Sequence, residues 1–195
     1  MEPIRRCGWC NPNNPLYIAY HDEEWGVPQH DDGKLFELLV LESFQAGLSW
    51  ETILNKREAF RSAFGGFDPE AVAAYGEERT AALLEDRSIV RNRRKIAAAV
   101  RNAGVFLEIQ AEWGSFSRYI WHFTDGQVVY ETGKASSPLS DRVSADLRRR
   151  GMTFVGTTIV YAYLQAIGVI HSHDPGCFLL REGWGGRDGF QFPSV

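Results

Sequence analysis

The chain has 195 residues and a mass of 22.0 kDa, a length typical of one domain or of two small lobes that share a core. Hydrophobic residues make up 44% and charged residues 24%, which argues against a disordered chain, and no apolar run approaches the roughly 20 residues of a membrane helix. The net charge of −4 and the pI near 5.8 argue mildly against a nucleic-acid partner.

Helix signals dominate the sequence. Asp68 before Pro69 is typical of a capped helix start, Ser140 is the expected cap of a polar helix, and Gly151 and Gly168 are typical stops. The predicted helices, in chain order, cover residues 35–41, 50–64, a segment starting at Pro69, 89–107, 115–123, 140–150 and 157–167. The sequence therefore predicts an all-α fold.

Two segments differ from this helical pattern. Residues 127–130 are predicted to be extended, and residues 181–195, rich in glycine with scattered aromatics, are predicted to form an irregular C-terminal arm. No internal repeat and no convincing sheet is found. We expect a single domain over residues 1–180, either undivided or formed by two helical lobes with a pocket between them.

Cysteines and histidines gather near the two ends of the chain. No signal peptide is recognised, so free thiols or a metal site are expected rather than disulfides. Zinc prefers four thiolate and imidazole ligands, and the candidates are Cys7, Cys10, His21, His171, His173 and Cys177. Spacing alone favours Cys7, Cys10, His173 and Cys177. Such a site would join the chain ends in a reducing compartment, the cytoplasm; the alternative is free thiols and solvated histidines.

Positive charge is concentrated in two segments despite the acidic total. Residues 87–101 carry basic side chains and no acid, namely Arg87, Arg91, Arg93, Arg94, Lys95 and Arg101. The second segment, 148–150, leads into a glycine turn that opens a helix at Gly156, where free backbone N–H groups favour a phosphate. Two helices joined by a glycine hairpin form an arrangement that binds a nucleic-acid backbone without reading its sequence. The alternative is an ordinary loop with a solvated arginine face.

Five stretches of sequence, in a fixed order, carry a more specific pattern. They are RCGW at 6–9, LYIAYHD at 16–22, EWGVP at 24–28, Glu42 with QAGLSW at 45–50, and FVGTT at 154–158. Together they resemble the DNA-3-methyladenine glycosylase I family, over nearly the whole chain except the tail. The resemblance implies a helix-hairpin-helix DNA glycosylase fold with a zinc site that joins the N- and C-terminal segments. It also implies hydrolysis of the N-glycosidic bond of N3-methyladenine, and as an open alternative N3-methylguanine, in alkylated double-stranded DNA, which leaves an abasic site.

The resemblance also implies which residues hold the metal. The family's ligands fall on Cys7, His21, His173 and Cys177, which bind one structural Zn²⁺. This choice replaces the spacing-based choice of Cys10. With four protein ligands, no coordination position is left for a catalytic water.

The base pocket is likewise implied by the resemblance. Glu42 matches a carboxylate that reads the base, Tyr20 a hydrogen-bonding tyrosine and Trp50 a stacking partner, so these three are the predicted catalytic residues. The full predicted pocket is Trp9, Tyr20, Trp25, Glu42, Phe44 and Trp50.

Helical spacing supports the choice of Glu42 independently. Glu42 follows Leu35, Leu38 and Leu39 by seven, four and three residues, so a helix places it on their apolar face. A carboxylate there is costly to bury unless it is paired. The alternative is therefore that Glu42 is the structural partner of an arginine.

Two segments are predicted to contact DNA. The turn after the predicted pocket helix supplies a wedge that fills the gap left by a flipped nucleotide, although Leu48 fits a core position equally well. The hairpin supplies phosphate contacts. The predicted DNA-binding residues are Gln45, Gly47, Leu48, Gly156, Thr157 and Thr158.

Two features leave open questions. Ser43 and Phe44 stand where some family members carry smaller or more polar residues, so the pocket's preference for 3-methyladenine over 3-methylguanine is not decided. Asp174 follows Gly156 by 18 residues, as a catalytic aspartate does in many superfamily relatives, but it lies in an Asp-Pro-Gly sequence between two predicted ligands. A turn is the favoured interpretation of that sequence.

The predicted chemistry needs little acid–base assistance. The cationic base of N3-methyladenine is a good leaving group, and its charge is attracted to the face of Trp50. Thr157 and Thr158 follow the hairpin glycine where lyase-type relatives keep a lysine, so we expect a monofunctional enzyme. We expect a monomer with no membrane partner. The alternative function is a non-catalytic sensor of damaged DNA with the same fold.

Overall fold

The computed structural model describes residues 4–180, and the predicted arm at 181–195 lies outside the described residues. The chain is mainly helical, which confirms the predicted class. The elements are α1 (Pro15–Ala19), the π-helical turn η1 (Tyr20–Glu24), α2 (Asp32–Gln45), α3 (Trp50–Leu54), α4 (Arg57–Ala63), the 3₁₀ turn η2 (Gly65–Phe67), α5 (Pro69–Ala73), α6 (Glu77–Glu85), α7 (Arg93–Trp113), α8 (Phe116–His122), β1 (Val129–Tyr130), α9 (Pro138–Arg149), α10 (Thr157–Ala166) and β2 (Ile170–His171). Among these helices, none combines the length and apolar character needed to cross a bilayer.

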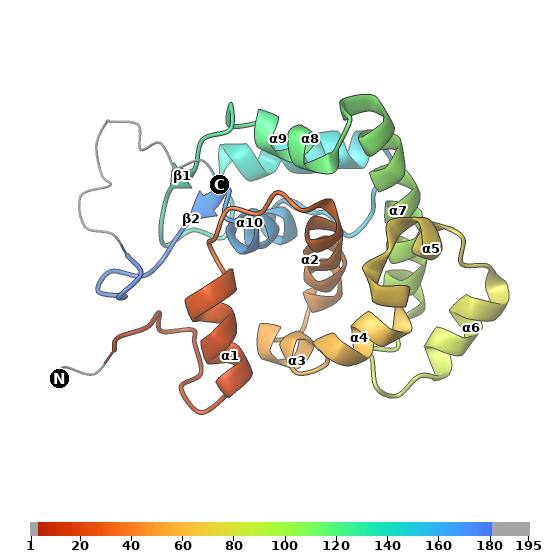
Figure 1. Ribbon diagram of the computed structural model, residues 1–195, viewed down its shortest axis with the longest axis horizontal. Coiled ribbons are helices and arrows are strands. Elements are labelled where there is room, and N and C mark those ends of the chain that lie inside the picture. The colour runs from red at the N-terminus through yellow and green to blue at the C-terminus, as the bar shows by residue number, and fades with distance from the viewer. Residues whose placement is uncertain (1–3, 181–195) are drawn as a thin grey trace.

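Helix α2 is the central element of the fold. It packs against α3, α7, α8 and α10, and lies between the α5–α7 end and the end with the two strands (Figure 1). All residues from Leu35 to Phe44 are buried, including Glu37 and Glu42. A helix that is buried on all sides must find partners for its polar groups inside the protein, so these two acids are of special interest.

Capping residues explain several helix boundaries. The Asp68 side chain accepts from the Glu70 N–H before Pro69, as predicted. Helix α9 begins at Pro138, earlier than predicted, because Ser137 is the N-cap and Ser140 is its capping-box partner. The prediction that Ser140 is the cap was therefore wrong.

Four short helical segments and one break were not predicted. The predicted helix over 50–64 is divided into α3 and α4, and the Lys56 ammonium at the break donates to the Ser88 carbonyl oxygen at 2.8 Å. Helix α1, η1, η2 and α6 were missed because three to nine residues are too few for a clear helical period. Asn14 caps α1, and its side-chain amide also donates to Glu51 of α3 at 2.8 Å.

The two ends of the described chain meet beside a small parallel sheet. Strand β1, within the segment predicted to be extended, pairs with β2, which was not predicted. The Phe178 N–H donates to the Arg5 carbonyl oxygen at 2.9 Å, so the two ends of the described chain lie side by side, at the end of the molecule that carries the strands (Figure 1).

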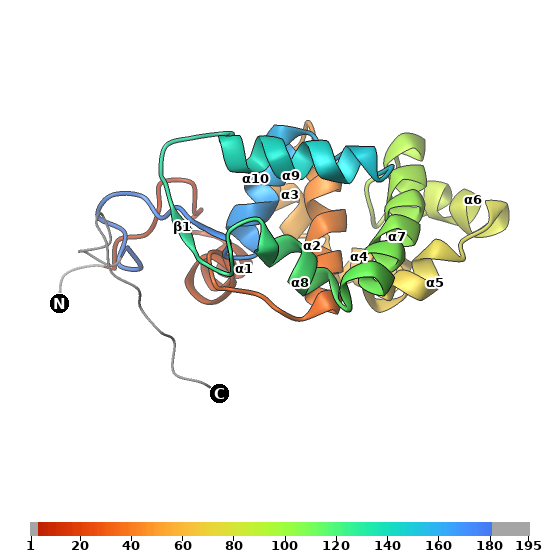
Figure 2. The ribbon, with the colours of Figure 1, turned by 90° about the horizontal axis from the view of Figure 1, so that it is seen from above.

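The predicted hairpin connects α9 to α10, and both helices pack together (Figure 2). Buried Asn102 of α7 makes two hydrogen bonds of 2.9 Å with the backbone of Thr153. The Ser43 hydroxyl of α2 donates to the Phe154 carbonyl oxygen at 3.2 Å. These contacts hold the hairpin beside the end of α2 that carries Glu42.

Candidate active site and metal centre

The two buried acids of α2 have opposite environments. Glu37 accepts from Arg57 and from Arg61, each at 2.7 Å. Glu42 is only 3% exposed, yet no ion pair to it is found within residues 4–180, and its Oε2 atom has no hydrogen-bond partner there. The structural partner of the arginines is thus Glu37, and Glu42 is left for another role.

Glu42 borders a cavity of about 330 Å³ between α1, η1, α2, α3 and α10. Tyr20 and Trp50 also line it, with their ring centroids 5.1 Å apart. The Tyr20 hydroxyl and the Trp50 indole nitrogen are buried and lack a partner in the described part of the chain. Such unsatisfied groups each cost about 1–3 kcal/mol, so they indicate a site for a polar ligand. The three predicted catalytic residues are therefore brought together.

Trp9 and Trp25 also line this cavity, as predicted, and their rings make an edge contact at 4.8 Å. Phe44 does not line it. The Phe44 ring is fully buried against Phe60 and Phe64, at 4.8 and 5.7 Å, on another side of α2. Its placement in the pocket was thus a wrong prediction, because Phe44 and Glu42 are two residues apart on a helix and face different directions.

Several lining residues were not predicted from the sequence. They are Tyr17, Gly133, Lys134, Ala162, Gln165, Ser172 and Asp174. Tyr17 lies three residues before Tyr20, a spacing that could have indicated a shared helix face. Asp174 was singled out by its spacing from Gly156 but interpreted as part of a turn, and the others come from segments distant in sequence and carry no comparable signal.

Burial controls the ionisation of the cavity's acid. Desolvation raises the pKa of Glu42 to about 8, and burial also raises that of Tyr17 to about 12. Without a ligand, the Glu42 carboxyl is largely neutral at pH 7, and a bound cation would stabilise its charged form. The cavity is therefore suited to a cationic or amine-bearing ligand.

Four buried side chains converge to form a potential metal site. The ligand atoms of Cys7, His21, His173 and Cys177 all lie within 4.8 Å of one another. The Cys7 sulfur is 3.3 Å from Nδ1 of His173, and the Cys177 sulfur is 3.5 Å from Nε2 of His21. Burial lowers the pKa of His173 to about 4, so this imidazole is neutral and able to ligate.

The surroundings of these four residues support metal binding. Nδ1 of His21 lies 2.7 Å from Asp22, and Arg6 holds that carboxylate through contacts of 2.6 to 3.0 Å. A carboxylate behind a histidine ligand fixes its ring and its tautomer. The spacing-based choice of Cys10 was wrong: its thiol donates instead to the Tyr17 carbonyl oxygen at 3.6 Å.

The potential metal site adjoins the cavity wall that is formed by Trp9 and Trp25. His173 makes edge contact with Trp25 at 4.8 Å, and His21 lies 5.1 Å from Trp9. Asp174 lines the cavity, accepts from the Gly8 N–H at 2.7 Å and forms the turn to Cys177. The predicted turn is thus present, and the same residue is part of the cavity wall.

The predicted DNA-contact residues lie on two segments, the turn after α2 and the start of α10. Gln45 lines the cavity, Gly47 has a φ of 79°, and Leu48 is 40% exposed rather than part of the core. Gly156 precedes α10, where Thr158 is exposed. The Thr157 hydroxyl, however, donates to the Asp141 carboxylate at 2.6 Å, so this side chain is already hydrogen-bonded within the protein.

Only some of the basic side chains in the two basic segments are free to contact DNA. Lys95 is buried, and its ammonium donates to the carbonyl oxygens of Phe44 and Ala46 at the end of α2. Arg101 binds the hairpin carbonyl of Gly151. Arg150 pairs with Glu112 and Asp146. In the first segment Arg87, Arg91, Arg93 and Arg94 are exposed, so charge runs in the sequence overstated the surface available to DNA.

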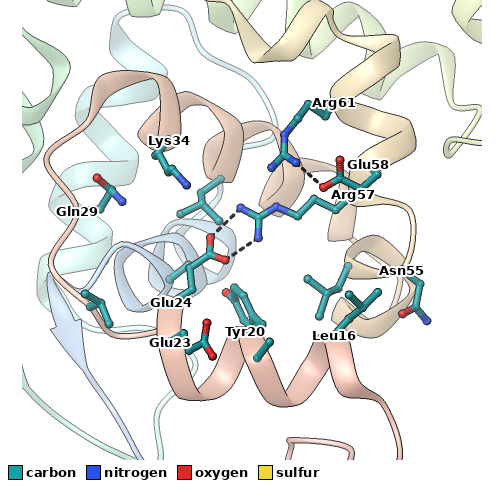
Figure 3. A pocket seen from close by; sticks show the side chains of 15 residues that line it. Leu16, Tyr20, Glu23, Glu24, Gln29, Lys34, Asn55, Arg57, Glu58 and Arg61 are labelled. Carbon is teal, nitrogen blue, oxygen red and sulfur yellow. Dashed lines mark hydrogen bonds and ion pairs between the residues drawn. The ribbon is translucent and has the colours of Figure 1, made fainter.

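A second cavity of about 490 Å³ lies on the other side of Tyr20 (Figure 3). Arg57 extends into it from α4 and binds both carboxylate oxygens of Glu24 at 2.6 and 2.7 Å, as well as Glu37. It thereby connects η1, which carries Tyr20, to α2, which carries Glu42.

Arg57→Ala should destabilise the protein because it leaves the Glu24 carboxylate without its ion-pair partner and the buried Glu37 carboxylate with Arg61 alone. We expect a loss of about 3 kcal/mol in the free energy of unfolding, measured by urea denaturation. Arg61→Ala is the control: its side chain is 38% exposed, and we expect a loss below about 1 kcal/mol. Equal losses in the free energy of unfolding in both variants would show that the ion pairs of Arg57 stabilise the fold no more than those of Arg61.

Comparisons with known proteins agree with this arrangement. The profile of the methyladenine glycosylase family matches residues 9–180. The chain is 46% identical over 180 residues to DNA-3-methyladenine glycosylase 1 of Escherichia coli (strain K12), which covers 89% of this chain and 96% of that protein. It is 36% identical over 178 residues to the DNA-3-methyladenine glycosylase of Haemophilus influenzae, with 88% and 96% covered.

Solved structures show the same relationship. A crystal structure of 3-methyladenine DNA glycosylase I has a TM-score of 0.86 and 45% identity, covering 90% of this chain and 99% of that chain. A variant of such an enzyme in complex with 3-methyladenine has a TM-score of 0.84 and 34% identity, covering 88% and 97%. The chain belongs to the methyladenine glycosylase family.

Proposed function

We propose that this chain is a DNA repair enzyme that hydrolyses the N-glycosidic bond of N3-methyladenine in alkylated double-stranded DNA. It releases the free base and leaves an abasic site. The observation that carries the proposal is the buried Glu42, which finds no counter-ion among the residues that the structure describes and borders a cavity together with Tyr20 and Trp50. The related enzyme in complex with 3-methyladenine supports the same substrate class. The non-catalytic alternative is not favoured, because the curated relatives are glycosylases.

Each of these residues has a chemical role in the proposal. The Trp50 indole attracts the cationic base, and the Glu42 carboxylate accepts a hydrogen bond from its exocyclic amine. The Tyr20 hydroxyl donates to the base. Water attacks the sugar carbon and loses one proton to solvent, the bond between this carbon and the base nitrogen breaks, and the electron pair of that bond neutralises the charged base. Since this leaving group is already activated, selective binding of the charged base supplies most of the discrimination.

The nucleotide must leave the duplex stack to enter the cavity, at a cost of about a few kcal/mol. In the proposal, exposed Leu48 fills the gap and the backbone N–H groups after Gly156 bind a phosphate. Gln45, which lines the cavity, belongs to the same turn as Gly47 and Leu48.

We infer that the metal is one structural Zn²⁺. Two thiolates and two imidazoles in a buried cluster fit its preferred tetrahedral coordination. The ion would supply a cross-link between the segments around Cys7 and Cys177, and the same segments form one wall of the cavity. We propose that the enzyme acts as a cytoplasmic monomer with residues 1–180 as one glycosylase domain.

The direct test is base release from methylated duplex DNA, with the products identified by chromatography. We expect release of 3-methyladenine, and the same assay decides whether 3-methylguanine is also released. Unmethylated DNA is the control. Tight binding of methylated DNA without base release would instead support the non-catalytic alternative.

The enzyme is expected to leave the DNA strand intact, because Thr157 and Thr158 follow Gly156 and carry no amine. Gel electrophoresis before and after alkaline treatment should show cleavage only after alkali. A strand nick without alkali, together with a protein–DNA adduct trapped by borohydride, would contradict a monofunctional mechanism.

A further inference from the structure

One basic side chain stands out on the wall of the Glu42 cavity. Among the described residues that line the cavity, Lys134 is the one with a basic group, from the segment between β1 and α9. Its side chain is 48% exposed, whereas Glu42 and Tyr20 are 3% and 4% exposed. Lys134 therefore lies at the rim of the cavity and the predicted catalytic residues lie at its base.

The fold holds the backbone of this segment in place. Gly133, with a φ of 70°, makes the turn that precedes Lys134. The Glu131 N–H donates to the His171 carbonyl oxygen at 3.3 Å, next to the segment that carries the potential metal ligand His173. The Glu131 carboxylate, whose side chain is 11% exposed, pairs with the Lys134 ammonium at 2.5 Å. The ammonium is thus directed to one place on the rim rather than free in solvent.

The charge of Lys134 does not suit the base itself. An ammonium in contact with a cationic base would repel it, so the lysine must serve the anionic part of the nucleotide. When a base occupies the cavity, its sugar is at the opening and its two phosphates are outside. A cation at the rim is then close to a phosphate, and a point charge such as lysine suits that role.

We propose that Lys134 binds a backbone phosphate next to the flipped nucleotide and thereby holds the nucleotide in the cavity. This inference rests on the proposed glycosylase function. It places a phosphate contact on the side of the cavity formed by residues 133–134, separate from the contacts that the hairpin would make at Gly156.

The test measures binding of the full chain to a duplex that contains a tetrahydrofuran abasic-site analogue, at several KCl concentrations. Lys134→Met removes the charge and keeps an unbranched apolar side chain, and Lys134→Arg keeps the charge. Lys34→Met is the matched control: Lys34 is an exposed lysine that lines the second cavity, and it lies about 16 Å along α2 from Gln45 at 1.5 Å per residue.

The slope of log K against log salt is negative, and loss of one phosphate contact reduces its magnitude by about 0.9. We expect this change, with several-fold weaker binding at low salt, for Lys134→Met, and wild-type slopes for Lys134→Arg and Lys34→Met. Binding of free 3-methyladenine, measured by calorimetry, should be unchanged in all three variants.

Three results would overturn the assignment. They are an unchanged salt slope in Lys134→Met, an equal change in Lys34→Met, and loss of free-base binding in Lys134→Met, which would place the lysine in the base site. Failure of the wild-type protein to bind free 3-methyladenine and to release it from DNA would instead contradict the proposed function.

Discussion

Glu42→Gln is expected to reduce base release by about 100-fold or more while making the folded protein more stable. The amide retains the shape of the side chain but cannot supply the negative charge that the cationic base needs in this dry cavity. Single-turnover release of 3-methyladenine from methylated duplex measures the first effect. A variant that keeps wild-type activity would show that Glu42 does not recognise the base.

The gain in stability follows from the ionisation of Glu42. Burial raises its pKa from about 4.5 to about 8, so the folded state binds this proton more tightly than the unfolded state does. Stability is therefore lost as the pH rises from about 4.5 to about 8. Glutamine is neutral throughout, and we expect Glu42→Gln to raise the free energy of unfolding by at least about 1 kcal/mol at pH 8 and little near pH 4. Urea denaturation at both pH values measures this difference.

The same pKa predicts the pH dependence of activity. The permanently charged nucleotide should bind the ionised form of Glu42, so kcat/KM should rise with pH and reach a plateau above about pH 8. Glu42→Gln should lack this rise, at its lower activity. A flat wild-type profile from pH 6 to 9 would contradict the role of the carboxylate, and Lys34→Met serves as a control that keeps the wild-type profile.

Removal of the metal is expected to have the other large effect. A structural zinc contributes of the order of 10 kcal/mol to folding, so chelation or Cys7→Ser should lower the melting temperature by at least about 10 °C. The ring of Trp9 contacts the His21 imidazole, and the ring of Trp25 contacts the His173 imidazole. Loss of the metal should therefore also weaken the binding of free 3-methyladenine. Metal analysis by atomic emission and thermal denaturation with and without a chelator measure these effects.

Cys10→Ser is the matched control for this experiment, because the Cys10 thiol contacts the Tyr17 carbonyl and not the cluster. It should retain one equivalent of metal and lose little stability. Zinc loss in Cys10→Ser would show that the ligand set is wrong. A metal-free protein that stays folded and binds the base but releases none from DNA would contradict a purely structural metal.

The sequence by itself determined the helical class and most of the long helices. Apolar spacing, Asp68 before Pro69 and the stop at Gly168 are local signals, and they act through backbone groups only a few residues away. Family resemblance identified Glu42, Tyr20 and Trp50 as a group and selected His21 over Cys10 at the potential metal site. Spacing alone had chosen the wrong cysteine.

Only the tertiary structure decided which charged side chains are paired and which are left over. Glu37 and Glu42 are both acids on the buried helix α2, and Arg57 forms an ion pair with Glu37. Lys95 and Arg150 belong to basic segments, yet one holds the end of α2 and the other pairs with acids. The position of Lys134 at the cavity rim is decided in the same way. The free energy of each such contact depends on burial and on partners distant in the chain, which the local sequence does not record.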